Sequence, residues 1–359
     1  MKLLTTDDVS RIVATVGLPA LTARLVDYLE ADFRRWPEFD KSPRSAAHSD
    51  VGVIELMPIA DANDYSFKYV NGHPGNAKLG LSTVVAFGAL ADVATGLPGF
   101  ISELTLTTAI RTAATSVMAA KRLARPDATT MALIGNGAQS EFQAIAFHHG
   151  LGITEVRVFD VDPAATDKLV RNLAAAAPAL RVVRAASTAD AVRGADIVTT
   201  VTADKTCATI LTPDLIEAGM HLNGVGGDCP GKTEMARGVL ERASVFVEFE
   251  PQSRIEGELQ QMPADFAVTE LWQVPTGAAP GRRTRDEVTL FDSVGFALED
   301  YSALRLLRDC AEELGLGRDA GLIPALRDPK DLFGEMAMPA TATAGAVDAA
   351  KDTKATKAA

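Results

Sequence analysis

The sequence is poor in cysteine and histidine, and each shortage argues against a class of protein. Its 359 residues include three cysteines, Cys207, Cys229 and Cys310, which are too few and odd in number for a disulfide framework. The five histidines have no metal-ligand spacing, and the adjacent pair His148 and His149 would point in different directions on a helix. We therefore expect neither structural disulfides nor a metal site.

Positive charge and long apolar runs are also scarce. Lys and Arg number 35 against 47 Asp and Glu, a formal net charge of −12, which argues against nucleic acid or an anionic membrane as a partner. No apolar run reaches the roughly 20 residues that span a membrane, and no signal peptide opens the chain. With 47% hydrophobic and 23% charged residues, the composition is typical of a globular enzyme, which we expect in the cytoplasm.

The chain is organised around the stretch Thr130–Gln139, TMALIGNGAQ. A short apolar strand runs into Gly135-Asn-Gly137, and a helical pattern follows from Ser140. The glycines let the backbone approach a pyrophosphate, and the new helix directs free N–H groups and its positive end at that anion. This is the dinucleotide-binding fingerprint G-x-G-x-x-G, with Ser140 in place of the third glycine.

A second strand strengthens this interpretation. Residues 155–159 alternate in the manner of a strand and end at Asp160, roughly 25 residues after Gly135. An acid at that point typically binds the ribose of NAD and repels the 2′-phosphate of NADP. Two further strand patterns, at 196–202 and 220–227, predict a Rossmann domain over residues 128–302. The alternative is an α/β domain with a glycine-rich turn and no nucleotide.

The chain ahead of this domain has a different pattern. The expected elements are helices within 1–36 and at 103–123, strands at 51–57 and 65–70, and a hairpin across 83–101. We therefore expect an α/β protein whose second part is a β-rich α+β substrate domain, made of residues 1–127 and about 303–334. Residues 335–359 are low-complexity Ala, Thr and Lys, which predicts a disordered tail.

Three cations lie in the β-rich part at unusual positions. Lys68 interrupts a strand, Arg111 lies in a helix of small residues, and Arg44 precedes the first of these strands. Each could bind a substrate carboxylate, for which Arg offers a bidentate fork, or could be a solvated or internally paired charge. Glu55 lies inside the apolar strand 51–57 and needs a partner, which a substrate amine or Lys68 would supply.

A second dense cluster, Gly226–Lys232, reads GGDCPGK. It follows a strand pattern, so it lies at the carboxyl edge of the sheet, where Rossmann ligands bind. Asp228 could move protons on and off a substrate amine, and Lys232 could contact the cofactor; the alternative is a plain turn with a capping Asp. Cys229 has no histidine placed beside it, so we expect a packing role.

Across residues 30–305 the sequence resembles the ornithine cyclodeaminase/μ-crystallin family. The stretches that carry the resemblance are KSPRSAAHSDVGVIELMP, FKYVNGHPGN, SELTLTTAIRTAATS, ALIGNGAQSEFQA, TTVTADK, GVGGDCPGKTE, RIEGELQQ and FDSVGFALEDY. Ser140 belongs to this pattern, and no catalytic position of the family is lost.

The resemblance implies a set of site residues. Arg44, Lys68 and Arg111 would bind the substrate carboxylate. Glu55 would face the distal amine, and Asp228 would be the catalytic acid and base. Val294 would contact the substrate. The residues that would line the NAD site are Thr83, Arg111, Gly135, Gly137, Ala138, Gln139, Asp160, Thr202, Val225, Lys232 and Ser293.

The resemblance also implies an activity and an assembly. The family's ammonia-lyase reaction would convert L-ornithine into L-proline and ammonia: hydride leaves the α-carbon for NAD+, the δ-amine closes the ring on the imine, and the hydride returns. The protein would be a homodimer joined through the β-rich domain.

Two alternatives stay open at this point. One keeps the fold and changes the chemistry, to an NAD-dependent amino-acid dehydrogenase, an imine reductase or a lysine cyclodeaminase. The other is a μ-crystallin-like protein that binds a nucleotide and a small ligand without turnover. The intact Asp228 argues against the binding protein, Asp160 favours NAD over NADP, and Glu55 favours a diamino acid as the substrate.

Overall fold

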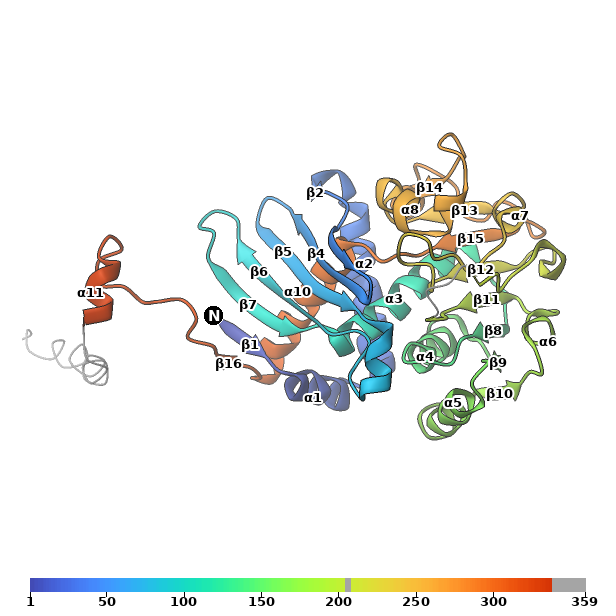
Figure 1. Cartoon of the computed structure of the whole chain (residues 1–359), viewed down its shortest axis with the longest axis horizontal. Coiled ribbons are helices and arrows are strands. Elements are labelled where there is room, and N and C mark those ends of the chain that lie inside the picture. The colour runs from blue at the N-terminus through green and yellow to red at the C-terminus, as the bar shows by residue number, and fades with distance from the viewer. Residues whose placement is uncertain (204–207, 338–359) are drawn as a thin grey trace, which may run out of the picture. The chain divides into compact units, whose positions relative to one another are not determined.

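The computed structural model describes residues 1–203 and 208–337, and residues 2–319 form one compact unit. Within this unit, two eight-stranded sheets lie next to each other (Figure 1). Met1 and the residues from 320 on form a separate unit that includes the short helix α11 (Leu332–Ala337). The predicted disordered tail thus begins inside a helix, and its residues 338–359, like Cys207, lie outside the described residues.

The sheet formed by strands between residues 130 and 292, which we call the second sheet, is parallel throughout. Its order is β10 (Arg181–Arg184), β9 (Glu155–Phe159), β8 (Thr130–Ile134), β11 (Ile197–Thr200), β12 (His221–Gly224), β15 (Thr289–Asp292), β13 (Ser244–Val247) and β14 (Thr269–Glu270). The chain starts at β8, builds outward to β10, and then returns to the other side of β8 with β11. This reversal of strand order opens a crevice at the carboxyl ends of the strands. The predicted Rossmann fold is confirmed.

Helices connect these parallel strands. They are α4 (Ser140–Leu151), α5 (Pro163–Ala176), α6 (Thr188–Val192), η3 (Pro213–Leu215), α7 (Arg237–Leu240), α8 (Glu250–Glu256), η4 (Glu258–Gln261) and α9 (Gln273–Thr276). Local sequence sets their ends: the Asp162 side chain accepts a hydrogen bond from Ala164 N at the start of α5, and Gly152 ends α4 with a φ of 76°. Side chains 131–134 of β8 are all buried, as expected for a strand covered on both faces.

The first sheet is mixed, with β1 parallel to β7 and its other pairs antiparallel. Its order is β16 (Arg318–Asp319), β1 (Lys2–Leu4), β7 (Pro98–Glu103), β6 (Ala86–Asp92), β5 (Asp64–Gly72), β4 (Gly52–Ala60) and β2 (Asp40–Lys41), with β3 (Ser45–Ser49) also paired to β4. The predicted β6–β7 hairpin is confirmed, and so is the β-rich character of this half. Whether each half is a domain with the predicted boundaries stays a prediction.

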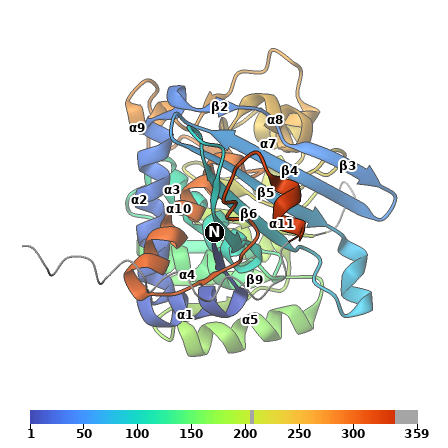
Figure 2. The same ribbon diagram turned by 90° about the vertical axis from the view of Figure 1, so that its left-hand side faces the viewer.

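Three long helices pack against one another. These are α2 (Leu18–Arg34), α3 (Thr105–Leu123) and α10 (Ala297–Leu314), and the shorter helices of this half are α1 (Thr6–Val16), η1 (Trp36–Glu38) and η2 (Pro74–Leu79). Helices α2 and α10 pack side by side (Figure 2), and α10 also packs on β4, β5 and β6. One apolar core runs through these helices from the first sheet to the second. The two sheets therefore contribute side chains to the same hydrophobic core.

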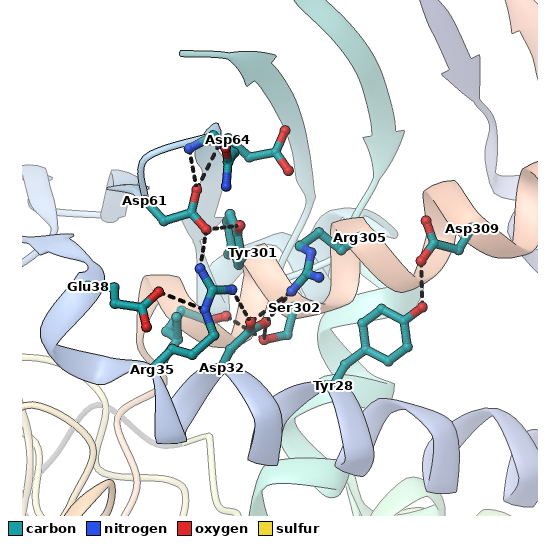
Figure 3. Close-up of polar contacts among 12 residues, drawn as sticks. Tyr28, Asp32, Arg35, Glu38, Asp61, Asp64, Tyr301, Ser302, Arg305 and Asp309 are labelled. Carbon is teal, nitrogen blue, oxygen red and sulfur yellow. Dashed lines mark hydrogen bonds and ion pairs between the residues drawn. The ribbon is translucent and has the colours of Figure 1, made fainter. Parts of the chain in front are cut away.

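A polar network fastens α2 to α10 (Figure 3). Buried Asp32 of α2 accepts hydrogen bonds from Ser302 Oγ at 2.8 Å and Arg305 Nη1 at 2.7 Å. Arg35 donates to Asp61 Oδ2 at 2.6 Å, and the same oxygen accepts from Tyr301 Oη at 2.9 Å.

No single helix in the described part of the chain passes a test of length and hydropathy for crossing a membrane. Helices α1 and α2, bent by 101°, pass it only when taken as a pair.

Candidate active site

The glycine turn after β8 requires the residues that the sequence has there. Gly135 has a φ of 95°, and a Cβ at this position would lie 2.8 Å from the Val201 carbonyl oxygen. A Cβ at Gly137 would meet no described atom within 4 Å, and α4 begins three residues later at Ser140. The backbone can thus come close to an anion in front of a helix N-terminus, which is a ready-made phosphate site.

Asp160 is fixed against this turn. Its Oδ2 accepts from Asn136 N at 2.6 Å, and its Oδ1 accepts from Asp162 N at 2.8 Å. At the N-terminus of α4, the buried Oε1 of Gln139 has no hydrogen-bond partner among the described residues. A glycine cradle, an unused helix end, an unpaired amide oxygen and a carboxylate at the end of β9 together fit a dinucleotide with a free ribose 2′-hydroxyl.

Lys68 and Arg111 meet two acids of α10 in a buried cluster. The Nζ atom of Lys68, a residue only 1% exposed, lies 2.7 Å from Asp300 Oδ2. Arg111 Nη1 lies 2.6 Å from Glu299 Oε2, and its Nε lies 3.2 Å from Asp300 Oδ1. Burial, and then the charge of Arg111, lowers the pKa of Lys68 to about 8. Burial raises the pKa of Glu299 to about 8, against the attraction of Arg111.

Arg44 ties β4 to the segment after β15. Its Nη1 donates to Glu55 Oε2 at 3.0 Å, and its Nη2 donates to the carbonyl oxygens of Val294 and Gly295, both at 2.7 Å. The partner of Glu55 is therefore Arg44. Lys68, which the sequence left open as the partner, is paired with an acid of α10 instead.

Glu256 and Gln252 of α8 also contact Arg44, and sequence reasoning gave neither of them a role. Glu256 Oε2 lies 3.0 Å from Arg44 Nε, while Gln252 accepts from Arg44 N at 3.3 Å. Burial raises the pKa of Glu256 to about 7, with Arg44 acting against the shift and Asp228 adding to it. Their spacing of four residues puts both side chains on one helix face, which is the signal that could have identified them.

Asp228 and Lys232 link the loops that follow β12 and β11. Buried Lys232 donates through Nζ to the Thr202 carbonyl oxygen at 3.0 Å and to Asp228 Oδ1 at 3.3 Å. The side chain of Asp228 is 54% exposed, so its carboxylate remains open to a reacting molecule. Val225, which precedes this loop, donates from its backbone N to the Thr200 carbonyl oxygen at 2.9 Å.

Glu248 holds the turn after β15. It accepts from Ser293 Oγ at 2.8 Å, from Gly295 N at 3.2 Å and from Val294 N at 3.3 Å. Gly295 has a φ of 76°, and a Cβ there would lie 2.6 Å from Arg111 Nη1. The turn can therefore pass directly over the cation cluster only because this position is glycine.

The predicted residues thus fall into linked groups. Contacts join Arg44, Glu55 and Val294, and Asp300 joins Lys68 to Arg111. Thr83 lies in the loop before β6, where its carbonyl oxygen accepts from His73 N at 2.8 Å. In the described part of the chain it makes no hydrogen bond to another predicted site residue.

Two surface cavities lie away from this site. One of about 310 Å³ beside Arg308 and one of about 410 Å³ beside Arg283 have no predicted site residue in their walls. Among residues 1–203 and 208–337, no group of three or more His, Cys, Asp or Glu side chains could hold a metal ion. We therefore define the candidate site by the contacts among its side chains, and not by a cavity or a metal-binding cluster.

A model of the ornithine cyclodeaminase/mu-crystallin family matches residues 6–315. The chain belongs to this family. An ornithine cyclodeaminase of Brucella melitensis is 54% identical over 328 residues, which are 91% of each chain. A member solved in a study of how lysine cyclodeaminase recognises L-lysine, L-ornithine and L-2,4-diaminobutyric acid is 33% identical, with a TM-score of 0.85 over 92% of this chain and 98% of the other.

A more distant similar structure is an archaeal alanine dehydrogenase dimer with bound NAD. It is 26% identical to this chain, with a TM-score of 0.81 over 90% of this chain and 99% of the other. These likenesses extend over both sheets. The two-sheet architecture is therefore that of the family, and the resemblance read from the sequence is confirmed.

Proposed function

We propose that this family member is an NAD-dependent ammonia-lyase that converts L-ornithine into L-proline and ammonia. The observation that carries the proposal is the 54% identity, over 91% of both chains, to an ornithine cyclodeaminase. The geometry supports it, because a dinucleotide cradle and a buried cluster of cations and acids lie in one compact unit.

NAD would supply a reversible hydride acceptor when bound. The turn of Gly135 and Gly137 would admit its pyrophosphate, with Ala138 and Gln139 at the N-terminus of α4. Asp160 would accept from the ribose, and its negative charge would oppose a 2′-phosphate. The other residues proposed to line this site are Thr83, Arg111, Thr202, Val225, Lys232 and Ser293.

The cation cluster is suited to a substrate carboxylate. Burial raises the pKa of Glu299 against the attraction of Arg111, which weakens the charge pairing of this acid with Arg111. Lys68 and Arg111 share the carboxylate of Asp300. The two cations would bind the α-carboxylate of an amino acid, which Arg44 would also approach.

The acids around Arg44 are suited to the other end of the substrate. Glu55 and Glu256 both lie 3.0 Å from this guanidinium and would favour a distal ammonium over an apolar side chain. Val294 would line the same space. A diamino acid held at both ends is bent toward ring closure, and such positioning accelerates intramolecular reactions strongly.

Asp228 would carry the protons. Substrate amines are charged in water, and both imine formation and attack by the δ-amine require a neutral nitrogen. An exposed carboxylate next to Lys232 Nζ can accept these protons and return one to the departing ammonia. The hydride given up by the α-carbon returns to the same carbon once the ring is closed, so that net redox is zero.

The protein is also proposed to be a homodimer joined through the first sheet. On the outer face of this sheet, Ile54, Leu56 and Phe87 are 42%, 47% and 41% exposed, and the rings of Tyr69 and Phe87 stack at 5.2 Å. An apolar sheet face of this kind is typical of an interface, and the archaeal relative is a dimer.

Turnover with L-ornithine and catalytic NAD+ tests the proposal. We expect proline and ammonia in equal amounts and no net NADH. Net NADH would indicate a dehydrogenase instead, and an absence of turnover with any amino acid would indicate a binding protein. L-Lysine belongs in the same assay, because the 33% identical relative recognises lysine as well as ornithine.

A further inference from the structure

Three buried carboxylates, those of Asp292, Glu258 and Glu234, succeed one another behind the loop that carries Asp228. Asp292, the last residue of β15, accepts from Glu258 N and from Leu259 N, both at 2.9 Å. Glu258 in turn accepts from Glu234 N at 2.6 Å and from Met235 N at 3.1 Å. Each carboxylate thus holds the backbone of the segment that supplies the next one.

The last of the three, Glu234, reaches the two loops of the candidate site. Its Oε2 accepts from Gly226 N at 2.9 Å, while its Oε1 accepts from Thr202 N at 2.8 Å and Thr202 Oγ1 at 2.6 Å. We call Asp292, Glu258 and Glu234 the carboxylate stack. It crosses the carboxyl ends of three neighbouring strands, β15, β12 and β11.

Each member of the carboxylate stack has a glycine against it. A Cβ at Gly257 would lie 2.6 Å from Asp292 Oδ2, and one at Gly227 would lie 2.7 Å from Glu258 Oε1. A Cβ at Gly226 would overlap the carboxyl group of Glu234. The three acids are at most 1% exposed, so the glycines give them room to reach backbone N–H groups that water does not reach.

A purely structural role is the simpler explanation, because buried N–H groups must find acceptors. Burying three carboxylates is a costly way to meet that need, and the position of the stack favours a further role. Gly226 opens the loop of Asp228, and the Thr202 carbonyl oxygen accepts from Lys232 Nζ at 3.0 Å. The stack therefore ends on the backbone that orients both side chains.

We propose that Asp292, Glu258 and Glu234 are positioning residues that fix the Asp228 loop relative to Thr202 and thereby keep Asp228 and Lys232 in their reacting geometry. The inference rests on the proposed role of Asp228. In this role the stack would act by orientation alone, through the backbone of Gly226 and Thr202.

The first test is steady-state kinetics of Glu258→Gln. The glutamine amide places an NH2 group opposite one of the two backbone N–H donors, Glu234 N or Met235 N, that Glu258 accepts from. That hydrogen bond is lost, and the segment that carries Glu234 shifts together with the Asp228 loop. We expect kcat for ornithine to fall roughly tenfold or more, because a displacement of about 1 Å can cost 100-fold. The KM for ornithine should stay within about twofold, because the cation cluster lies on other elements.

The matched control is Asp32→Asn, which removes another fully buried carboxylate, one that holds Ser302 and Arg305 between α2 and α10. It should lower the melting temperature and leave kcat within about twofold of the wild type. Equal losses of kcat in the two variants would show that the carboxylate stack contributes only to stability, as another buried carboxylate does, and would overturn the proposal.

A second substitution covers the case in which Glu258→Gln does not fold. Gly227→Ala keeps every carboxylate and displaces only the end of the Glu258 side chain, which would lie 2.7 Å from the new Cβ. The same loss of kcat with an unchanged KM is expected. A folded Gly227→Ala protein with wild-type kcat would contradict the proposal.

Amide hydrogen exchange tests the stack without any substrate, and so separates its failure from failure of the proposed function. In a folded variant at Glu258, exchange should accelerate at Glu234 and Met235 and also one step further, at Gly226 and Thr202. Exchange at Leu259, which Asp292 holds, should not change. Unchanged exchange at Gly226 would overturn the inference, whereas an inactive wild type would refute only the ornithine reaction.

Discussion

At the scale of single residues, Arg44 joins the parts of the candidate site. Its guanidinium contacts Glu55 of β4, Glu256 of α8 and two carbonyl oxygens after β15. A planar guanidinium with five donors can serve these four acceptors from three elements, whereas an ammonium has only three donors. Charge in the site is therefore shared among neighbours, so the effect of replacing one residue depends on which partner is left unpaired.

Asp228→Asn should abolish turnover of ornithine while leaving NAD binding nearly unchanged. The amide cannot accept a proton from a substrate amine, yet it keeps the size of the side chain and a hydrogen-bond acceptor for Lys232 Nζ, now 3.3 Å away. Activity can be followed as proline formed, and NAD affinity by titration calorimetry. Retention of more than about a tenth of the wild-type kcat would contradict the proposed role.

Glu256→Gln should change the pH profile. Burial raises the pKa of Glu256 to about 7, so the wild type gains a negative charge near Glu55 as the pH rises through 7. That charge attracts a distal ammonium, and kcat/KM for ornithine should rise over this range. The variant should lack this step but keep the rise due to the substrate amines; superimposable profiles would argue against Glu256 as a contact of the substrate.

At the scale of elements, period and register explain what the sequence could predict. In the structure, burial alternates along β4 and puts Glu55 on the buried face with Val53 and Met57, as the two-residue period of a strand requires. This period could not give the partner, because the β4–β5 register sets Glu55 opposite Val70 and Met57 opposite Lys68. The carboxylate stack has no local pattern, since its hydrogen bonds join residues 24 and 34 positions apart.

The contact of α2 with α10 yields a stability prediction. Asp61, in the β4–β5 turn, accepts from Asn63 N and Asp64 N at 2.8 Å as well as from Arg35 and Tyr301. Asp61→Asn loses charge-assisted bonds and should destabilise the protein by about 2 kcal/mol, measured by urea unfolding. The control is Glu38→Gln, an exposed acid on the same arginine, which should cost less than about 1 kcal/mol.

At the scale of the whole molecule, the sequence predicted the fold class and family correctly, because strand and helix periods and the glycine turn are local patterns. Two features needed the structure. The buried acids of α10 that pair with Lys68 and Arg111 look like ordinary helix residues in the sequence. The core that α2, α3 and α10 share between the sheets depends on packing between segments hundreds of residues apart.

The buried acids predict an unusual dependence of stability on pH. Burial raises the pKa of Glu256 and of Asp292 to about 7, so the folded state keeps protons that the unfolded chain releases above about pH 4 to 5. Stability should therefore fall as the pH rises from about 5 to 8.

Other groups limit stability at acid pH. Although burial opposes the shift, backbone N–H donors and Arg35 hold the pKa of Asp61 at about 2, and burial lowers the pKa of His221 to about 3. Stability from Asp61 is lost as the pH falls below about 4, and that from His221 below about 6.5. Thermal melts of the protein without cofactor should give the highest melting temperature near pH 5, and a steady rise from pH 5 to 8 would contradict this.

The central claim is that one hydride leaves and returns to the same carbon within a single turnover, and α-deuterated L-ornithine tests it directly. With catalytic NAD+, we expect L-proline that keeps the deuterium at its α-carbon, one ammonia per proline and no accumulation of NADH. Proline without deuterium, or deuterium that collects in NADH, would contradict the account.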